Sequence, residues 1–309
     1  MLTLALHWLG GRAAWLLFGG VTTGLLAPAL AALAWPLVLP VTFLLLVASV
    51  MRLDTAAALD HARRPLKPLL VVAVQMVAAP LAVAAAVMAL PLPPTLASSL
   101  ILTATTTPLL SSPAFCLLLG LEAELALIVL MGTMIAVPFT MPQLALSLLG
   151  LEIALSPAQF MGRLALFVGA GFAVAAALRW WIGARRIRTH ARALDGVNVL
   201  LLVCFAVGVM DGVTAKFLAD PRHVGQFVAA AFLFNLAMQT FGVLAFMPAG
   251  RRTALTAGFL SGYRNMPLPL VVLGAAAPAD FALYVAVAQL PMYMLPAVML
   301  PAYRRLLGR

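Results

Sequence analysis

The chain has few charged residues, and few of those are acidic. Charged side chains make up 9% of its 309 residues, with nine acids in total, whereas roughly a quarter of an ordinary soluble domain is charged. Hydrophobic residues make up 64%, and the mean hydropathy is +1.10. This balance excludes a separate soluble domain and predicts a polytopic membrane protein embedded in the lipid bilayer.

Residues that bind metals or support redox chemistry are also scarce. The two cysteines, Cys116 and Cys204, both fall in apolar segments, and two are too few for a disulfide framework or a metal site. The sequence has no phosphate-binding glycine loop and no nucleophile motif. We therefore expect no catalytic residue, no metal site, no cofactor and no enzyme activity.

The net charge of +10 does not predict a nucleic acid partner, because the basic residues lie in short loops between apolar segments. Loops rich in lysine and arginine stay in the cytoplasm. With the N-terminus inside, fifteen basic residues fall in cytoplasmic segments and three outside. This split predicts cytoplasmic N- and C-termini, and the Ala-, Leu- and Arg-rich composition favours a bacterial inner membrane.

A helix needs about 20 apolar residues to cross the hydrocarbon, and this criterion predicts ten spans. They cover approximately residues 13–32, 35–51, 68–90, 95–119, 123–147, 158–182, 196–213, 224–247, 252–274 and 279–303. We expect an all-α polytopic fold with one transmembrane domain, 1–309, made of two five-helix repeats, 1–150 and 151–309.

An odd number of spans in each half inverts the second half relative to the first. Pro113 precedes Gly120 by the same spacing in the fourth span as Pro267 precedes Gly274 in the ninth. Matching breaks in two halves are typical of secondary transporters with inverted repeats. We therefore predict discontinuous fourth and ninth helices that cross at mid-membrane.

The stretch Ser261–Pro267 is polar although it lies within an apolar segment. A break inside the membrane is tolerated only against protein or a water-filled cavity. An arginine at that depth, here Arg264, is costly and marks function by default. The residues expected to break the fourth and ninth helices are Pro108, Pro113, Gly262 and Pro267.

The segment Gly262–Leu270, preceded by Arg251 and Arg252, resembles the ninth helix of the bile acid:sodium symporter family. The segment Pro108–Ala114, followed by Gly120-Leu121-Glu122, resembles that family's fourth helix. The resemblance extends to chain length and span number. It implies a panel domain and a core domain, two discontinuous helices that cross, and sodium-driven uptake of bile acids or other organic anions.

The sodium ligands of that family are largely missing from this chain. Family positions with an acid, a glutamine, a Ser-Asn pair and two hydroxyls fall here on Leu260, Arg264, Pro113-Ala114, Ile128 and Gly132. Gln75 is the one side-chain match. Sodium stays a candidate coupling ion, but the missing oxygens favour sodium-independent transport.

Arg264 has three interpretations from the sequence. It replaces the ion as a tethered cation that holds the crossed helices, or it binds an anionic substrate through its fork of donors. Alternatively, it pairs structurally with carbonyls of the broken helices. No acid lies near the midplane of the spans to neutralise it, so carbonyls or a bound anion must balance its charge.

The other candidate substrate-binding residues are polar side chains near the breaks and amides in the third and eighth spans: Asn265, Ser261, Tyr263, Ser111, Ser112, Thr107, Gln75, Asn235 and Gln239. Hydrogen bonding between helices explains many of them equally well. Asn198 and Gln289 are weaker candidates. The half-helices that start near Pro113 and Pro267 are expected to present unpaired N–H groups and positive dipole ends, which attract anions.

These features favour a secondary transporter of a small or amphipathic organic anion that works by alternating access. The nearest alternative is a proton-coupled, sodium-coupled or facilitative carrier in which Arg264 is structural. A receptor or scaffold that kept the fold and lost transport is a further alternative.

Overall fold

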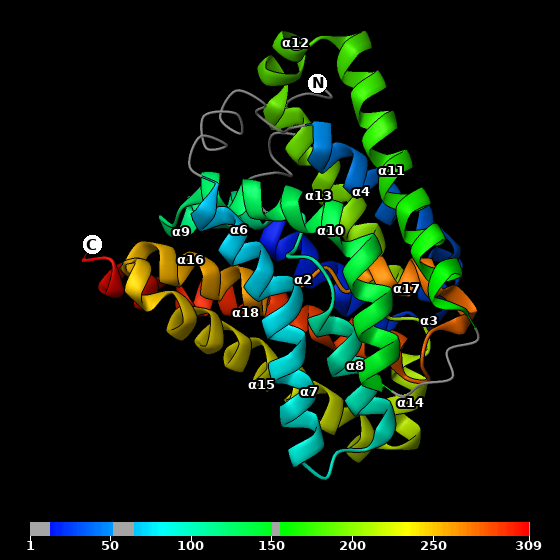
Figure 1. Ribbon diagram of the computed structural model, residues 1–309. Coiled ribbons are helices and arrows are strands. Elements are labelled where there is room, and N and C mark those ends of the chain that lie inside the picture. The colour runs from blue at the N-terminus through cyan, green and yellow to red at the C-terminus, as the bar shows by residue number, and fades with distance from the viewer. Residues whose placement is uncertain (1–12, 52–64, 150–154, 309) are drawn as a thin grey trace.

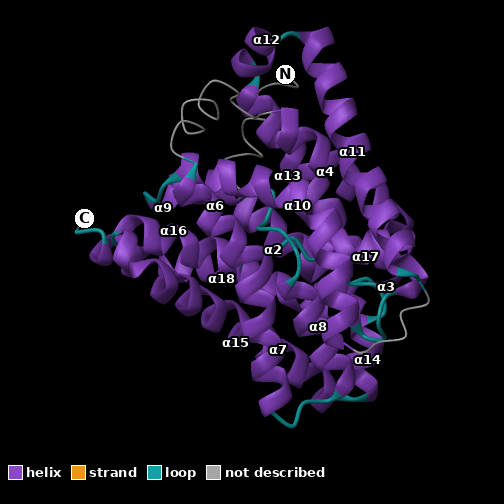
Figure 2. Ribbon diagram, in the orientation of Figure 1, coloured by secondary structure: helices purple, strands orange, loops and turns teal. Residues whose placement is uncertain are grey.

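The computed structural model describes residues 13–51, 65–149 and 155–308, and these form helices without a strand (Figure 1 and Figure 2). The helices are α2 (Ala13–Leu26), α3 (Pro28–Ala34), α4 (Val38–Met51), α6 (Leu66–Ala73), α7 (Ala79–Ala89), α8 (Pro94–Ala104), α9 (Ser112–Leu119), α10 (Ala123–Leu149), α11 (Pro157–Ile182), α12 (Ala184–Thr189), α13 (Ala191–Gly208), α14 (Val213–Ala219), α15 (Pro221–Phe246), α16 (Arg251–Gly262), α17 (Pro267–Leu273) and α18 (Phe281–Leu306). The predicted all-α class is confirmed. Five basic residues predicted to be cytoplasmic lie outside the described residues: Arg12, Arg52, Arg63, Arg64 and Arg309.

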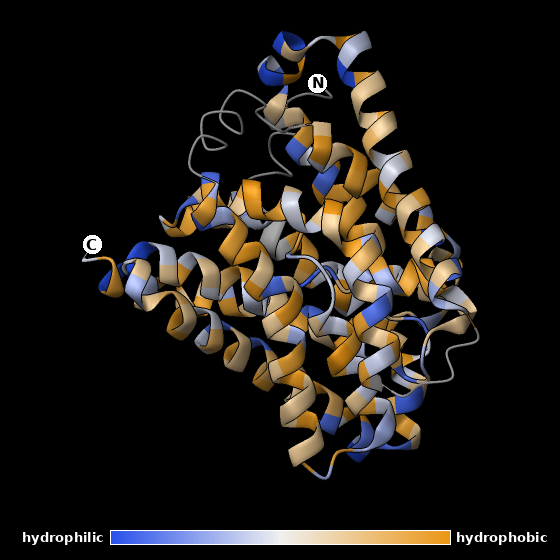
Figure 3. Ribbon diagram, viewed as in Figure 1, coloured by the Kyte–Doolittle hydropathy of each residue, from blue (hydrophilic) through white to orange (hydrophobic). Residues whose placement is uncertain are grey.

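Among the described residues, seven helical stretches are long and apolar enough to cross a membrane: Pro28–Met51, Leu66–Ala89, Ala123–Leu148, Pro157–Ile182, Ala193–Ala219, Pro221–Ala249 and Phe281–Leu306. Shorter apolar helices cover Leu16–Leu26, Pro94–Ala104 and Pro267–Ala276. Figure 3 shows hydrophilic residues gathered at α12, near α14 and at the start of α16, with mostly hydrophobic helices between them. The chain is a multi-pass membrane protein, as predicted.

Several helix boundaries differ by five or more residues from those predicted. The first helix ends at Leu26 rather than near residue 32, because Pro28 begins a new helix and cannot continue the previous one. α13 begins at Ala191, five residues before the predicted start at 196. Asp195, directly before the predicted span, therefore lies within a helix.

The helices pack in two groups. In the α13 group, α13 packs against α2, α3 and α4, and α11 packs against α4. In the α15 group, α16 and α18 pack against α15, while α10 packs against α6, α8 and α9. The groups meet where α10 packs on α11 and where α17 contacts both α4 and α11.

Glycines allow α15 and α16 to approach closely. A Cβ atom at Gly258 would lie 2.6 Å from Val243 Cγ2 and 2.7 Å from the Gln239 carbonyl oxygen. A Cβ atom at Gly262 would lie 2.7 Å from the Asn235 carbonyl oxygen. Spaced by four, these glycines share one helix face, the small-xxx-small pattern of membrane helix pairs. Their packing brings the end of α16 within reach of α15 side chains.

Gly258→Ala should destabilise the protein by roughly 1–3 kcal/mol, because the added methyl group meets backbone that cannot move aside. The measurement is the unfolding temperature of the purified protein in detergent. Gly225→Ala on α15 is the matched control, since a Cβ atom there meets nothing within 4 Å. Equal unfolding temperatures for the two variants would contradict the packing argument.

Candidate functional site

The segments that interrupt the fourth and ninth predicted spans lie against one another. They run antiparallel and are joined by two backbone hydrogen bonds. The N–H of Leu109 donates to the Tyr263 carbonyl at 2.9 Å, and the N–H of Asn265 donates to the Thr107 carbonyl at 2.8 Å. Each break thus supplies hydrogen-bond partners that the other lost on leaving the helix.

Arg264 is fully buried at this contact, and its guanidinium donates only to backbone carbonyls. Its Nε lies 2.9 Å from the Ser261 oxygen, and its Nη1 lies 2.9 Å from the Thr106 oxygen. Both Nη atoms lie 3.4 Å from the Gln75 oxygen. Within the described residues, its hydrogen-bond partners include no carboxylate.

Helix ends explain how this charge is tolerated. Ser261 lies in the last turn of α16, and Thr106 follows the last residue of α8 by two positions. A helix C-terminus carries about −0.5 elementary charge, so two such ends balance roughly one positive charge. The planar fork of arginine reaches both ends at once, which a lysine could not do.

A π turn supplies the third carbonyl around Arg264. It covers Val74–Ala78, and there the N–H of Ala79 donates to Val74 rather than to Gln75. The Gln75 carbonyl is thereby left for Arg264. The side chain of Gln75 also binds α16, because its Nε2 donates to Ser261 Oγ at 2.8 Å and to the Ala257 carbonyl at 3.2 Å.

A chain of side chains from α18 and α15 caps the end of α16. The Tyr303 hydroxyl donates to Gln239 Oε1 at 2.7 Å, and Gln239 Nε2 donates to Asn235 Oδ1 at 2.6 Å. Asn235 Nδ2 then donates to the Gly262 carbonyl at 2.9 Å. These buried amides therefore hold the broken helix in place.

A cavity of about 540 Å³ lies between the α13 group and the α15 group. One wall comes from α2, α4 and α13, and the other from the two breaks, α9, α17 and α18. Its polar lining residues are Thr42, Ser49, Asp195, Asn198, Ser111, Asn265, Gln289 and Tyr293. The rest is mostly apolar, and the described lining contains no lysine or arginine. Size and lining match those of small-molecule sites.

Of the predicted substrate-binding residues, Ser111 and Asn265 line this cavity. The Asn265 amide makes no hydrogen bond to another described residue, so it is available to a ligand. The other predicted residues are buried behind the wall: Arg264, Ser261, Tyr263, Ser112, Thr107, Gln75, Asn235 and Gln239. The structure therefore separates residues that can meet a ligand from residues that hold the breaks.

The predicted breaking residues lie at helix ends. Gly262 is the last residue of α16, and Pro267 is the first of α17. Pro113 is the second residue of α9, where the missing N–H costs nothing. Pro108 lies between α8 and α9, in the segment that pairs with Arg264.

The prediction of free N–H groups at the start of α9 is wrong. The N–H of Ser112 donates to the Leu109 carbonyl, and those of Ala114 and Phe115 donate to the Ser111 carbonyl. Pro113 has no N–H to offer. A ligand at this end would meet the helix dipole and side chains rather than free backbone donors.

Sequence reasoning missed the contribution of α13 to the cavity. Asp195 lies just outside the predicted seventh span, and Asn198 was rated a weaker candidate, yet both line the same wall. Their spacing of three residues places them on one helix face. That spacing was the available signal, and the misplaced helix start concealed it.

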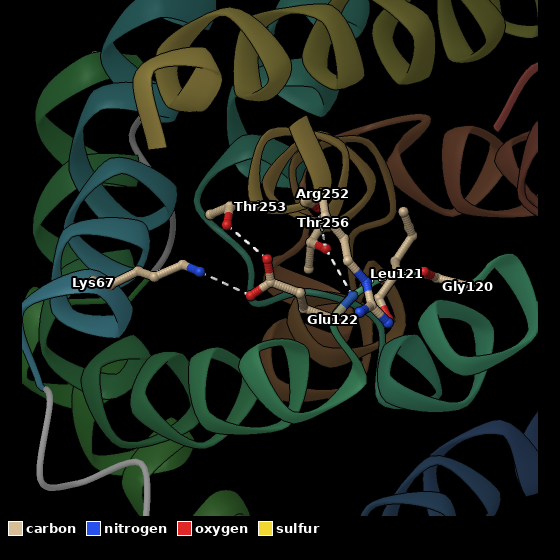
Figure 4. Close-up of polar contacts among 7 residues, drawn as sticks. All are labelled: Lys67, Gly120, Leu121, Glu122, Arg252, Thr253 and Thr256. Atoms are coloured by element: carbon tan, nitrogen blue, oxygen red, sulfur yellow. Dashed lines mark hydrogen bonds and ion pairs between the residues drawn. The ribbon is translucent and has the colours of Figure 1, made fainter. Parts of the chain in front are cut away.

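The far end of α9 is tied to α16 through Glu122 (Figure 4). Lys67 Nζ donates to Glu122 Oε2 at 2.8 Å, and Thr253 Oγ1 donates to Oε1 at 2.6 Å. Arg252 donates to the carbonyls of Gly120 and Leu121, each at 3.1 Å. The Gly120 φ of 75° is the left-handed conformation that ends many helices.

Asp280 forms a similar cluster before α18, as Glu122 does before α10. One of its oxygens accepts from Lys216, and the other lies 3.0 Å from His223 Nε2. Partial burial raises the pKa of each acid, but hydrogen bonds and nearby positive charge outweigh burial. The pKa of each carboxyl group therefore lies below its ordinary value.

Acidification should weaken the Glu122 cluster. A carboxylate whose folded pKa is lowered stabilises the fold above its unfolded pKa, about 4.3 for glutamate, and this is lost as pH falls through the folded pKa. Glu122→Gln should therefore lower the unfolding temperature at neutral pH and lessen its decline in acid. Asp211→Asn, at an exposed position, is the control. An unchanged acid decline in Glu122→Gln would contradict this role.

No protein-family model matches the chain, and no curated protein matches its sequence. The bile acid:sodium symporter resemblance therefore stays a prediction.

Proposed function

We propose that this chain is a secondary transporter, rather than an enzyme, and that it moves a small or amphipathic organic anion by alternating access. One observation carries the proposal: a ligand-sized cavity lies between two helix groups, with the contact of two broken helices on its wall. Movement of the α13 group relative to the α15 group would expose this cavity to one side of the membrane at a time.

Several features of the wall formed by the breaks favour an anion. α9 begins there at Ser112, and a helix N-terminus carries positive partial charge. The Asn265 amide and the Ser111 hydroxyl add hydrogen-bond donors. The mostly apolar remainder of the lining favours a substrate with a hydrocarbon body.

We propose ten spans in two inverted repeats, residues 1–150 and 151–309. Counting α8 with α9, α16 with α17, and α2 alone gives three spans beyond the seven long stretches. Glu122 follows the first broken helix and precedes α10, and Asp280 follows the second and precedes α18, as two repeats predict. We accordingly propose kinship with the bile acid:sodium symporter family.

The same proposal places the protein in a bacterial inner membrane with cytoplasmic termini. The short helix α12 carries Arg185, Arg186 and Arg188, as expected near the cytoplasm. In that orientation, Ser49 near the end of α4 and Asp195 near the start of α13 lie toward the cytoplasm. The cavity would then represent an inward-facing state.

Arg264 takes the place of a coupling ion in this mechanism. Its guanidinium occupies a cage of three carbonyl oxygens, where a bound cation could otherwise neutralise the ends of α8 and α16. Because this cation is covalently attached, it does not leave with the substrate. Transport should therefore not draw on a sodium gradient.

Uptake by purified protein in proteoliposomes tests the proposal, with radiolabelled octanoate as a simple amphipathic anion. Octanoate accumulation, measured relative to protein-free liposomes, should be unchanged when sodium is replaced by choline on both sides of the membrane. Asn265→Leu should abolish the protein-dependent part, whereas Leu200→Ala, on an exposed face of α13, should not. Strong stimulation by an inward sodium gradient would contradict the mechanism, and absent uptake would contradict anion transport.

A further inference from the structure

The cavity wall formed by α13 differs chemically from the wall formed by the breaks. Asn198 and Asp195 line it, with Ser49 from α4 beside them in the lining. The Oδ1 atom of Asn198 is buried and has no hydrogen-bond partner in the described part of the chain. A buried acceptor without a partner is destabilising and calls for an explanation.

The packing of α13 does not explain this acceptor. A structural amide would bond to a neighbouring helix, as Asn235 does at the Gly262 carbonyl. Asn198 instead lies beside the space between the two helix groups, three residues from the carboxylate of Asp195. Asn198 offers an acceptor without a partner among the described residues, Asp195 adds a carboxylate to the same wall, and the described lining contains no lysine or arginine. This wall is therefore rich in acceptors and suits a hydrogen-bond donor.

We infer that the α13 wall, through Asn198 and Asp195, recognises a hydrogen-bond-donating group on the same substrate whose anionic group faces Asn265. The substrate class is thus an amphipathic anion that also carries an ammonium or hydroxyl group, separated from the anionic group by a hydrocarbon body. This inference rests on the proposed function, because it assigns the second half of the same site.

Such a site discriminates against molecules that lack the donor. A ligand without a donor leaves Asn198 unpaired after water has been excluded, so its affinity falls. A plain fatty anion would fill the apolar space and satisfy only the wall formed by the breaks. Together the two walls therefore select a substrate by the distance between its two polar groups as well as by the charge of those groups.

Three probes with the same eight-carbon chain test this inference: octanoate, 8-hydroxyoctanoate and 8-aminooctanoate. Their affinities for the purified full-length protein are measured by isothermal titration calorimetry in detergent. Wild-type protein should bind at least one donor-bearing probe about tenfold more tightly than octanoate, a typical gain from one well-placed hydrogen bond. Asn198→Leu should remove this preference while leaving octanoate affinity nearly unchanged.

Asp195→Asn separates the two donor classes. It should weaken the binding of 8-aminooctanoate more than that of 8-hydroxyoctanoate, because only the ammonium group forms an ion pair with a carboxylate. Leu200→Ala, on an exposed face of the same helix, should leave all three affinities unchanged and shows that changes in α13 are not harmful in themselves.

The outcomes distinguish this inference from the proposed function. Equal binding of all three probes by the wild type, or a donor preference that survives Asn198→Leu, would overturn the inference and leave anion binding intact. Failure of every probe to bind would overturn both. An Asn198→Leu variant that loses octanoate as well would show a structural role and would also overturn the inference.

Discussion

Backbone groups at a helix break inside a membrane need hydrogen-bond partners, and the rest of this structure depends on that constraint. Water cannot satisfy them within the hydrocarbon, where each unpaired group costs several kcal/mol. Here the two breaks pair with each other, and Arg264 donates to the Thr106 carbonyl after α8 and to the Ser261 carbonyl in α16. The π turn leaves the Gln75 carbonyl as a further acceptor for Arg264. The hydrogen-bonded side chains from Tyr303 to Asn235 satisfy the Gly262 carbonyl.

This arrangement links the stability of the fold to the position of the cavity. The partners of Arg264 come from α16, from the break after α8 and from the π turn before α7, so one side chain fixes three segments. Asn265, directly after Arg264, is thereby held at the cavity wall. Arg264, which does not line the cavity, therefore fixes the position of the Asn265 amide on the cavity wall.

The sequence allowed the helical class, the membrane environment and the two breaks to be predicted. Hydropathy reports spans well because their length is set by the bilayer, and the prolines and glycines marked the breaks. The partners of Gln75, Asn235 and Gln239 could not be predicted, because an amide in a span bonds equally well to a ligand or to a helix end. The role of Asp195 was missed because α13 begins before its apolar segment does. A pair of residues spaced i, i+3 can be recognised only when the bounds of the helix are known.

The central claim is that Arg264 acts as an internal cation for the crossing of the broken helices. Chemical rescue tests it most directly: octanoate uptake by Arg264→Ala in proteoliposomes, with and without added guanidinium chloride at a concentration too low to denature the protein. The variant should lose uptake, and guanidinium should restore it, because the free ion can donate to the same carbonyls, whereas choline should not. Uptake at the wild-type rate without any added cation, or equal restoration by choline, would contradict the claim.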